Sequence, residues 1–328
     1  MRNVDMEYRK LGKSDITVSE ISLGCWTLGG LNWVNGVPNG WADVNEKDAR
    51  NAIRWALDNG VNHFDNADVY GNGRAERMLA RSLGGRNTDV VIATKVGHFP
   101  GTAAHAYDAL HVRHQCEQSL KNLQRDYIDI YYFHHGNFGA NDCYLPEALE
   151  TVHRLRDEGK IRVIGLSAYS DEDFERLIPK IRPTVVQSWA NALDDRFIRP
   201  GSRVRKLLDS ESISFVAFSP LAKGLLLDKY SAKNPPTFEE GDNRRNNASF
   251  SAENLAKLAP KLAKLKSRFG EATEDLVRVA LQYVLHEPVV ACVIPGFRDR
   301  DQVQLNVGAH GRPLTNDDVA FVRDVLAE

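Results

Sequence analysis

Four side chains with complementary chemistry lie at or just after the ends of apolar runs in the sequence. Asp65 ends the second such run, Tyr70 follows it by five residues, Lys95 ends the third run and His134 ends the fourth. Each residue type alone says little, because an aspartate is often a cap and a tyrosine is often a packing residue. If the runs are parallel strands, their carboxyl ends meet at one edge, and we expect the four side chains to converge there.

Such a set has a definite chemistry. The phenol of tyrosine has a pKa of about 10 and is a weak acid at pH 7. A neighbouring ammonium group lowers that pKa because it stabilises the phenolate, and we expect Lys95 to act on Tyr70 in this way. Asp65 would keep the lysine charged, and His134 would orient a carbonyl oxygen or share its proton. The result is a general acid aimed at a developing oxyanion, as carbonyl reduction requires.

Apolar, β-branched runs alternate with helical patterns along the whole chain, which is typical of a parallel sheet with crossover helices. Eight runs start at Ile21, Asn62, Val90, Ile128, Ile161, Thr184, Ile213 and Val289. The first and last starts are seven intervals apart, so (289 − 21)/7 gives roughly 38 residues per strand, loop, helix and loop. This repeat predicts an α/β fold, a (β/α)8 TIM barrel that forms a single domain over residues 1–328.

Other segments place structure around the eight repeats. The opening EYRKLGKSDITVSE alternates around a Gly-Lys-Ser-Asp turn and predicts a β-hairpin that plugs one end of the barrel. In NEKDARNAIRWALDNG, Asn45 can cap a helix and Gly60 can end it. Residues 32–43 and 222–251 read as irregular. The second of these predicts a long seventh βα loop that acts as a lid, followed by the helices SAENLAKLAPKLAKLKSRFG and TEDLVRVALQYVLHEP.

Composition limits the class of protein. The chain has 328 residues, 42% of them hydrophobic and 26% charged, as in ordinary globular proteins. Lys and Arg number 42 against 44 Asp and Glu, so the net charge is 42 − 44 = −2 and nucleic acid is not an expected partner. Neither a secretory signal nor an apolar membrane span is apparent. The four cysteines are isolated, which favours reduced thiols. We therefore expect a cytoplasmic protein that does not bind membranes.

The motifs around the four side chains resemble those of the aldo-keto reductase superfamily, NAD(P)H-dependent (β/α)8 barrels, over nearly the whole chain. FDNADVYGNGRAER resembles the segment that carries the family's Asp and Tyr, which are Asp65 and Tyr70 here. IATK gives Lys95, and DYIDIYYFHHGN gives the catalytic histidine as His134 and not His135. The long seventh loop and the IPGFR ending look most like the bacterial and potassium-channel β-subunit branch.

The resemblance also implies a cofactor site, although no Gly-rich turn opens a Rossmann helix in this sequence. Ser167 and Gln187 would lie at the nicotinamide carboxamide, and Phe218 would stack on the nicotinamide ring. The other implied cofactor contacts are Trp26, Ser219, Leu221, Lys223, Gly224, Gly296, Arg298, Gln302 and Asn306.

Three positions near this site depart from the family pattern: Ala168 stands where Asn is common, Phe297 where a small residue is usual, and Leu305 where an acidic residue is common. A 2′-phosphate would pair with Arg298, with help from Lys223, Arg244 or Arg245, because guanidinium groups bind phosphate in a bidentate manner. We expect NADPH as the cofactor, with NADH as the alternative.

Aromatic and polar residues at the predicted strand ends indicate the substrate. Trp33, His98, His135 and Trp189 are the expected substrate contacts. Aromatic walls with a few polar groups suit a sugar-like carbonyl compound, whose C–H faces stack on indole rings. No metal site is expected, because the closely spaced His111 and His114 lack a third ligand.

Three functions remain open at this point. The preferred one is an NADPH-dependent reductase that interconverts carbonyl compounds and alcohols, with Tyr70 as general acid and base. The second is a cofactor-binding regulatory subunit with slow turnover. The third is a Schiff-base aldolase that uses Lys95, since barrels of this kind also support that chemistry. The sequence leaves the substrate, the physiological direction of the reaction and the oligomeric state undetermined.

Overall fold

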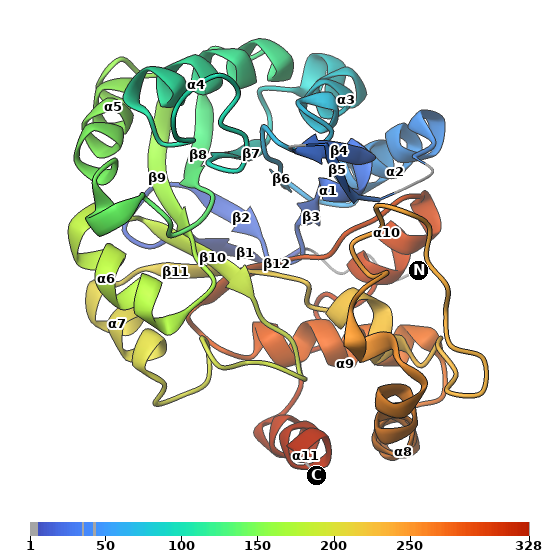
Figure 1. The fold of residues 1–328 in the computed structure, drawn as a ribbon. Coiled ribbons are helices and arrows are strands. Elements are labelled where there is room, and N and C mark those ends of the chain that lie inside the picture. The colour runs from blue at the N-terminus through green and yellow to red at the C-terminus, as the bar shows by residue number, and fades with distance from the viewer. Residues whose placement is uncertain (1–5, 35, 42–43, 328) are drawn as a thin grey trace.

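The computed structural model describes residues 6–34, 36–41 and 44–327, and eight parallel strands ringed by helices form its centre (Figure 1). The strands are β3 (Leu23–Gly24), β6 (His63–Asp65), β7 (Val91–Val96), β8 (Ile128–Phe133), β9 (Ile161–Ser167), β10 (Val185–Trp189), β11 (Ser214–Phe218) and β12 (Val290–Ile294). Each pairs with the next along the chain, and the parallel bridges Ile21↔Val293 and Gly24↔Gly296 join the first to the last. The predicted (β/α)8 barrel and its eight strands are confirmed.

Helices cover the outside of the barrel and fix the strand ends. They are α1 (Trp26–Gly29), α2 (Glu46–Asp58), α3 (Arg74–Leu83), α4 (Ala109–Leu123), α5 (Leu145–Asp157), α6 (Asp171–Ile181), α7 (Arg203–Glu211), α8 (Ala252–Phe269), α9 (Thr273–Leu285), α10 (Arg300–Val307) and α11 (Asn316–Ala327). As expected, Asn45 caps α2, where its side chain accepts hydrogen bonds from two backbone N–H groups. No helix in the described part of the chain is long and apolar enough to cross a membrane.

A hairpin closes the end of the barrel where the strands begin. Strands β1 (Tyr8–Lys10) and β2 (Thr17–Ser19) pair antiparallel, as the sequence predicts. The apolar hairpin side chains Leu11, Ile16 and Val18 are buried together with the side chains that fill the barrel. Those barrel residues are Ala93, Ile130, Tyr132, Val185, Val216, Ala291, Cys292 and Ile294. The opposite end, where the strands finish, is left as the mouth.

A second hairpin, which the sequence does not reveal, stands at the mouth. Residues 32–43 were expected to be irregular, but β4 (Leu31–Val34) and β5 (Val37–Gly40) pair antiparallel in this segment, while residues 35 and 42–43 lie outside the described part. The turn between the two strands contains Gly36, whose φ of 76° suits glycine. The sequence does not reveal these strands because Gly and Pro are typical of loops. Pro38 fits in β5 because proline is tolerated in a strand where no N–H is needed for pairing.

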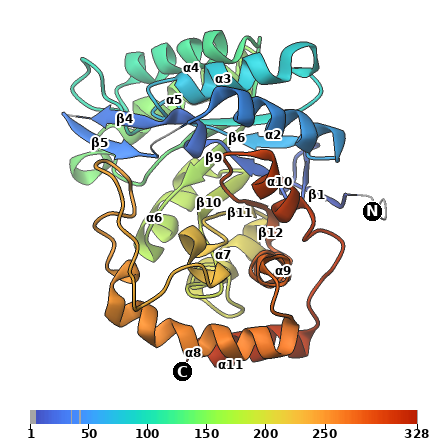
Figure 2. The same cartoon turned by 90° about the vertical axis from the view of Figure 1, so that its right-hand side faces the viewer.

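The connection after β11 is long, as predicted, and is ordered around the short helices η3 (Ala222–Leu227) and η4 (Ala248–Phe250). It crosses from β11 to the β4–β5 hairpin and returns to α8, which lies beside α11 (Figure 2). Two further short helices, η1 (Gly84–Arg86) and η2 (Ala140–Asp142), lie in loops elsewhere. The predicted helices after Phe250 are α8 and α9. The mouth is thus bordered by the hairpin on one side and this connection on the other.

Candidate active site

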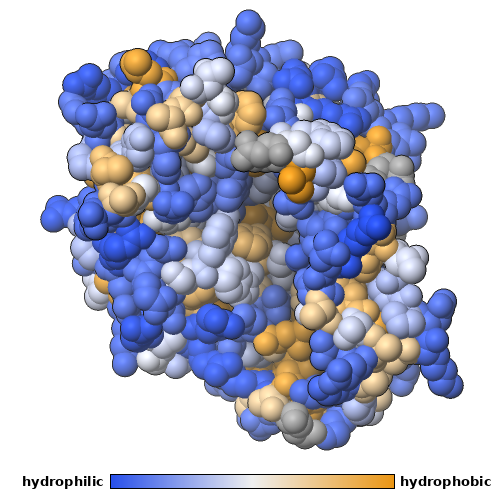
Figure 3. Space-filling view, viewed as in Figure 1, coloured by the Kyte–Doolittle hydropathy of each residue, from blue (hydrophilic) through white to orange (hydrophobic). Residues whose placement is uncertain are grey.

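The strand ends bring Asp65, Lys95 and His134 to the mouth, as the sequence predicts. Asp65 ends β6, Lys95 lies near the end of β7, and His134 directly follows β8. Tyr70 comes from the loop after β6 and completes the set. Figure 3 shows that the surface on this side of the molecule is hollowed near its centre.

A buried ion pair lies at the base of the site. The ammonium group of Lys95 donates hydrogen bonds to Asp65 Oδ1 and, at 2.6 Å, to the backbone oxygen of Asn66. The other carboxylate oxygen, Asp65 Oδ2, accepts from Gln187 Nε2 at 2.7 Å. The side chains of Lys95 and Asp65 are 1% and 2% exposed. Because each group has a partner, the pair can stay charged away from water.

Tyr70 is held against this pair by close packing. The Lys95 Nζ atom lies 5.2 Å from the centre of the Tyr70 ring, and Trp26 stacks on the ring at 5.9 Å between centroids. The Tyr70 loop also packs tightly against α1, since a Cβ atom added at Gly71 would lie 2.1 Å from the Gly29 oxygen. Gly71 has a φ of 57°, so glycine is required there for two reasons.

The electrostatic effect on Tyr70 differs from the expectation. Burial and the Asp65 carboxylate raise the pKa of Tyr70 well above its ordinary value, whereas we expected Lys95 to lower it. The reason is the ion pair, because Asp65 offsets the positive charge that would otherwise favour a phenolate. Burial also lowers the pKa of Lys95. The phenol of Tyr70 is therefore protonated at neutral pH, as a proton donor must be, but it is a weaker acid than free tyrosine.

His134 is neutral in this environment. Burial, with help from His98 and Lys95, lowers the pKa of the His134 imidazole well below its ordinary value. Its ring lies 5.9 Å from that of Tyr70 between centroids. A neutral imidazole carries one N–H and can donate one hydrogen bond. The Nδ1 atom is buried and has no hydrogen-bond partner in the structure.

Two residues implied to bind the cofactor carry buried polar atoms without partners. Ser167 at the end of β9 and Asn306 in α10 are 1% and 3% exposed, and Ser167 Oγ and Asn306 Nδ2 bond to no described group. Buried polar atoms are normally satisfied, so each is suited to a ligand group. They come from opposite ends of the implied cofactor site, which fits an extended ligand laid across the mouth. Gln187, by contrast, uses its amide N–H on Asp65.

The strand end after Phe218 makes a compact turn. Ser219, Lys223 and Gly224 have positive φ values of 53°, 56° and 92°, so the backbone coils tightly where the resemblance implies the pyrophosphate. Leu221 packs on the main core and Phe218 on the barrel interior. Burial lowers the pKa of Lys223, and the Asp242 carboxylate offsets part of this effect.

At the far end of the implied site, Gly296 follows β12 and Gln302 accepts a hydrogen bond from the backbone N–H of Arg298 at 3.0 Å. The Arg298 guanidinium lies 5.6 Å from the Trp41 ring and forms no ion pair within 4 Å among the described residues, although its charge helps to lower the pKa of Asp242. It is therefore available for an anion.

Arg244, by contrast, already has partners. It forms an ion pair with Asp242 at 2.6 Å, and its guanidinium lies 4.7 Å from the Trp41 ring and 4.3 Å from the Phe238 ring. The expectation that Arg244 helps to hold a 2′-phosphate is therefore less well supported than the same expectation for Arg298.

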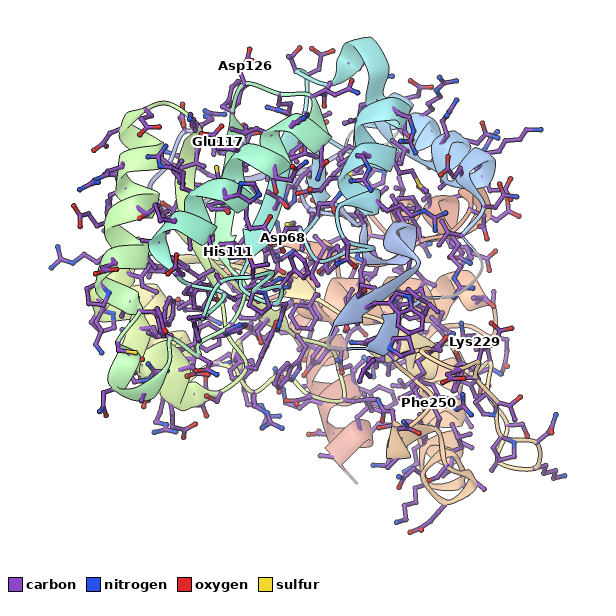
Figure 4. All side chains as sticks on the ribbon, turned by 45° about the horizontal axis from the view of Figure 1, so that its top comes forward. Asp68, His111, Glu117, Asp126, Lys229 and Phe250 are labelled. Atoms are coloured by element: carbon purple, nitrogen blue, oxygen red, sulfur yellow. The ribbon has the colours of Figure 1, made fainter. Side chains whose placement is uncertain are left out.

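The long connection is fastened to the hairpin at the mouth. The Gly40 N–H donates to Gly241 O at 2.9 Å, and the Asn243 N–H donates to Gly40 O at 3.2 Å. We call this contact between Gly40 and residues 241–243 the clasp. A Cβ atom at Gly40 would lie 2.3 Å from the Gly30 oxygen, so no larger residue fits there without a shift. Figure 4 shows two other residues of this long connection, Lys229 and Phe250, on the opposite side of the view from His111.

The expected substrate contacts lie at different places on the mouth. Trp33 is 57% exposed on the β4–β5 hairpin, at the rim. Trp189 ends β10, and its indole N–H donates to Asp194 at 2.8 Å, which fixes the ring. The His98 ring lies 4.3 Å from that of His134, within the site.

His135 does not offer a free nitrogen, unlike His134. Its Nε2 atom bonds to Gly97 O at 2.7 Å, and its Nδ1 atom accepts from the Asn137 N–H at 3.1 Å. The His135 ring lies 4.8 Å from that of His98, so it borders the site without offering it a nitrogen. Both nitrogens are occupied within the protein, so the expectation of a substrate contact through the His135 ring is not supported.

Tyr169 is a residue of the site that the sequence analysis missed. It lies two residues after the end of β9, and its hydroxyl donates to the backbone oxygen of His134 at 2.9 Å. The ring stacks between His98, at 6.4 Å, and Trp189, at 6.3 Å. Its position just after a strand end was the available signal, since Asp65, Lys95 and His134 were selected on that ground.

The described residues contain no group of three or more His, Cys, Asp or Glu side chains arranged to hold a metal ion. Of the two closely spaced histidines, His111 bonds through Nε2 to Phe99 O at 2.6 Å. That contact gives His111 a structural role.

The comparisons with known proteins agree with this geometry. A family model described as "Aldo/keto reductase family" matches residues 20–327. The chain belongs to this family. Its relatives include an uncharacterised oxidoreductase of Bacillus subtilis, 29% identical over 96% of this chain and 94% of that protein. They also include a probable voltage-gated potassium channel β subunit of Arabidopsis thaliana, 29% identical over 93% and 91%.

Among solved structures, an aldo-keto reductase fold occurs in the glycerol dehydrogenase of Gluconobacter oxydans. That chain is 25% identical to this aldo/keto reductase, with a TM-score of 0.80 over 100% of this chain and 96% of that one. The similarity to bacterial oxidoreductases and to channel β subunits confirms the branch indicated by the sequence motifs.

Proposed function

We propose that this aldo/keto reductase is an NAD(P)H-dependent oxidoreductase that interconverts carbonyl compounds and alcohols, with Tyr70 as its general acid and base. The observation that carries the proposal is the protonated phenol of Tyr70 beside the buried Lys95–Asp65 pair, at the mouth of the barrel. A carbonyl oxygen that gains negative charge needs such a donor. We also propose that residues 1–328 act as one barrel domain.

Each residue of the set has a separate task. A nicotinamide cofactor, when bound, supplies the hydride for the carbonyl carbon. The neutral imidazole of His134 donates a hydrogen bond to the carbonyl oxygen and fixes its direction. Tyr70 passes its hydroxyl proton to that oxygen, and Lys95 stabilises the phenolate that remains. Asp65 keeps Lys95 charged and oriented through a direct bond.

Two of the residues that would hold the cofactor carry buried polar atoms without a partner. Ser167 and Asn306 would bond to its carboxamide and adenine ends, and Phe218 would stack on the nicotinamide ring. Arg298, which forms no close ion pair among the described residues, would bind a 2′-phosphate, so we propose NADPH as the preferred cofactor. NADH remains the alternative. Changing Arg298→Gln should weaken the binding of NADPH more than that of NADH, as measured by fluorescence titration.

The substrate is proposed to be a small carbonyl compound of the aldehyde, ketone or sugar-like type. Trp189 and Tyr169 provide stacked aromatic faces that hydrogen bonds hold in place, and the His98 ring lies between Tyr169 and His134. Aromatic faces of this kind pack on the C–H groups of sugars. The similarity to a glycerol dehydrogenase agrees with a hydroxylated substrate.

A direct assay tests the proposal. Purified protein should oxidise NADPH at a steady rate with at least one member of a panel of short aldehydes, aromatic aldehydes and sugars. A protein that oxidises bound NADPH only once per molecule, with no substrate that gives steady turnover, would instead be a regulatory subunit of the kind suggested by the channel relatives.

The aldolase alternative is disfavoured by the pairing of Lys95. A Schiff-base lysine must attack as a free amine, whereas this ammonium group is bonded to a carboxylate. Treatment with borohydride in the presence of a carbonyl substrate should therefore leave Lys95 unmodified.

A further inference from the structure

His134 O, the Tyr169 hydroxyl and His98 Nε2 form a short chain of hydrogen bonds, and the donor and acceptor in each bond are fixed. The backbone oxygen of His134 can only accept, so the Tyr169 hydroxyl must donate its single proton there, at 2.9 Å. The Tyr169 oxygen then has only acceptor capacity for its other neighbour, His98 Nε2, at 3.4 Å. His98 must therefore carry its proton on Nε2.

The second nitrogen of His98 is left as a bare acceptor. Burial, with His135 and Lys95, lowers the pKa of the His98 imidazole to about 4, so the ring is neutral at pH 7. With the proton on Nε2, Nδ1 carries a lone pair and accepts hydrogen bonds. No group in the described ranges bonds to this Nδ1 atom. The ring itself is only partly buried and lies at the mouth.

Neighbouring rings hold His98 beside His134, the residue proposed to bind the carbonyl oxygen, and the His135 ring lies 4.8 Å from that of His98. The His98 ring lies 4.3 Å from the His134 ring between centroids, at an interplanar angle of 66°. On its other side it stacks on Tyr169 with an angle of 8°. Tyr169 is in turn stacked on Trp189, whose indole N–H is bonded to Asp194. His98 is thus clamped in place, and its free nitrogen can select a ligand.

We infer that His98 is a specificity-determining residue that accepts a hydrogen bond from a hydroxyl on the carbon next to the substrate carbonyl. The donors Tyr70 and His134 take the carbonyl oxygen, and the acceptor on His98 takes the adjacent hydroxyl. The favoured substrates are therefore α-hydroxy aldehydes and α-hydroxy ketones, and the corresponding products are vicinal diols. This inference rests on the proposed reductase function.

The test compares two ketones of nearly equal shape. Hydroxyacetone has the α-hydroxyl, and butanone has a methyl group in its place. The wild-type protein should show a kcat/KM at least about tenfold higher for hydroxyacetone, as expected for one hydrogen bond to an otherwise unpaired acceptor. His98→Phe should bring the ratio of the two kcat/KM values close to one, and His98→Asn, which retains an acceptor oxygen, should recover part of the preference.

Two more variants make the result specific. Tyr169→Phe removes the hydroxyl that fixes the tautomer of His98, so the ratio should fall but remain above that of His98→Phe. His153→Phe, the same change on α5 far from the mouth, should leave the ratio unaltered.

An aromatic aldehyde without an α-hydroxyl, 4-nitrobenzaldehyde, distinguishes failure of the proposed His98 role from failure of the proposed reductase function. If it is reduced but the wild-type protein does not prefer hydroxyacetone, or if His98→Phe keeps the preference, the role of His98 is refuted while the reductase function stands. If none of the three compounds is reduced, the proposed function itself fails.

Discussion

The ammonium nitrogen of Lys95 lies 5.2 Å from the centre of the Tyr70 ring, and a carboxylate neutralises it in the same buried space. The lysine therefore does not make Tyr70 a strong acid in the resting protein. Its charge becomes useful only when the phenol loses its proton. A group that stabilises the product of proton transfer more than the starting state contributes to rate and not to binding.

Changing Tyr70→Phe should remove the proton donor and preserve the ring that packs on Trp26. General acid catalysis contributes on the order of 10²- to 10⁴-fold, so kcat should fall within that range. Cofactor affinity should stay within about twofold of the wild type, since the hydroxyl is proposed to act on the carbonyl. Steady-state kinetics and fluorescence titration measure the two quantities. Full activity in this variant would show that the acid is a different group.

Changing Ser167→Ala should weaken cofactor binding without destabilising the free protein. The hydroxyl is buried with no partner at hydrogen-bond geometry among the described residues and acts only on the pKa of Tyr169, so its removal costs the free protein little. One lost bond to the cofactor is worth about 1 kcal/mol, which corresponds to a Kd about fivefold higher. Ser119→Ala, at another buried serine in α4, provides the control and should leave the Kd unchanged. A lower Tm with an unaltered Kd would contradict the assignment.

Changing Gly40→Ala should loosen the clasp, because the new Cβ atom would collide with the Gly30 oxygen. The long connection would then hold its place over the mouth less well, and cofactor should dissociate about tenfold faster, which corresponds to roughly 1.4 kcal/mol. Stopped-flow displacement measures the rate. Gly85→Ala is a suitable control, since a Cβ atom there meets nothing within 4 Å. Equal release rates in the Gly40 variant and the wild type would show that the clasp does not retain cofactor.

Stability should fall as the pH drops below the ordinary range of histidine, because His63 is buried and neutral. Burial and Lys95 lower its pKa in the folded protein from 6.5 to about 3. Between these two values the unfolded chain binds a proton that the folded protein does not. The free energy of unfolding is therefore fully retained above pH 6.5 and decreases toward pH 3, by about 1.4 kcal/mol per pH unit for one proton.

The variant His63→Gln should make that dependence shallower, as measured by denaturant unfolding at a series of pH values between 4 and 7. His114→Gln, a change at an exposed residue of helix α4, should keep the wild-type slope. A slope that is identical in the His63 variant would show that other buried groups dominate acid unfolding.

Local patterns were enough to predict the barrel, because each strand is a β-branched run and each helix repeats its apolar residues on one face. The same logic placed Asp65, Lys95 and His134, since strand ends share one mouth. The β4–β5 hairpin was missed because Gly36 and Pro38 are common in loops as well as in hairpins. Its pairing depends on contacts with the distant residues 241–243.

The finer properties of the site depend on distances that no sequence pattern contains. The direction of the Tyr70 pKa shift follows from how closely Asp65 pairs with Lys95. His134 keeps an unpaired nitrogen, whereas both nitrogens of His135 are bonded to the backbone of Gly97 and Asn137. These bonds involve loop residues that no strand pattern specifies. Arg244 was a reasonable candidate for a phosphate until the structure showed it paired with Asp242.

Because the β1–β2 hairpin closes one end of the barrel, the interior is reached only from the mouth. The buried side chains of the hairpin fill that end, so in the proposed reductase substrate and product would reach and leave Tyr70 on the side where the clasp lies. The substrate and the proposed dinucleotide cofactor would then share one entrance. In the proposed reductase, the one that lies deeper would therefore have to bind first and leave last.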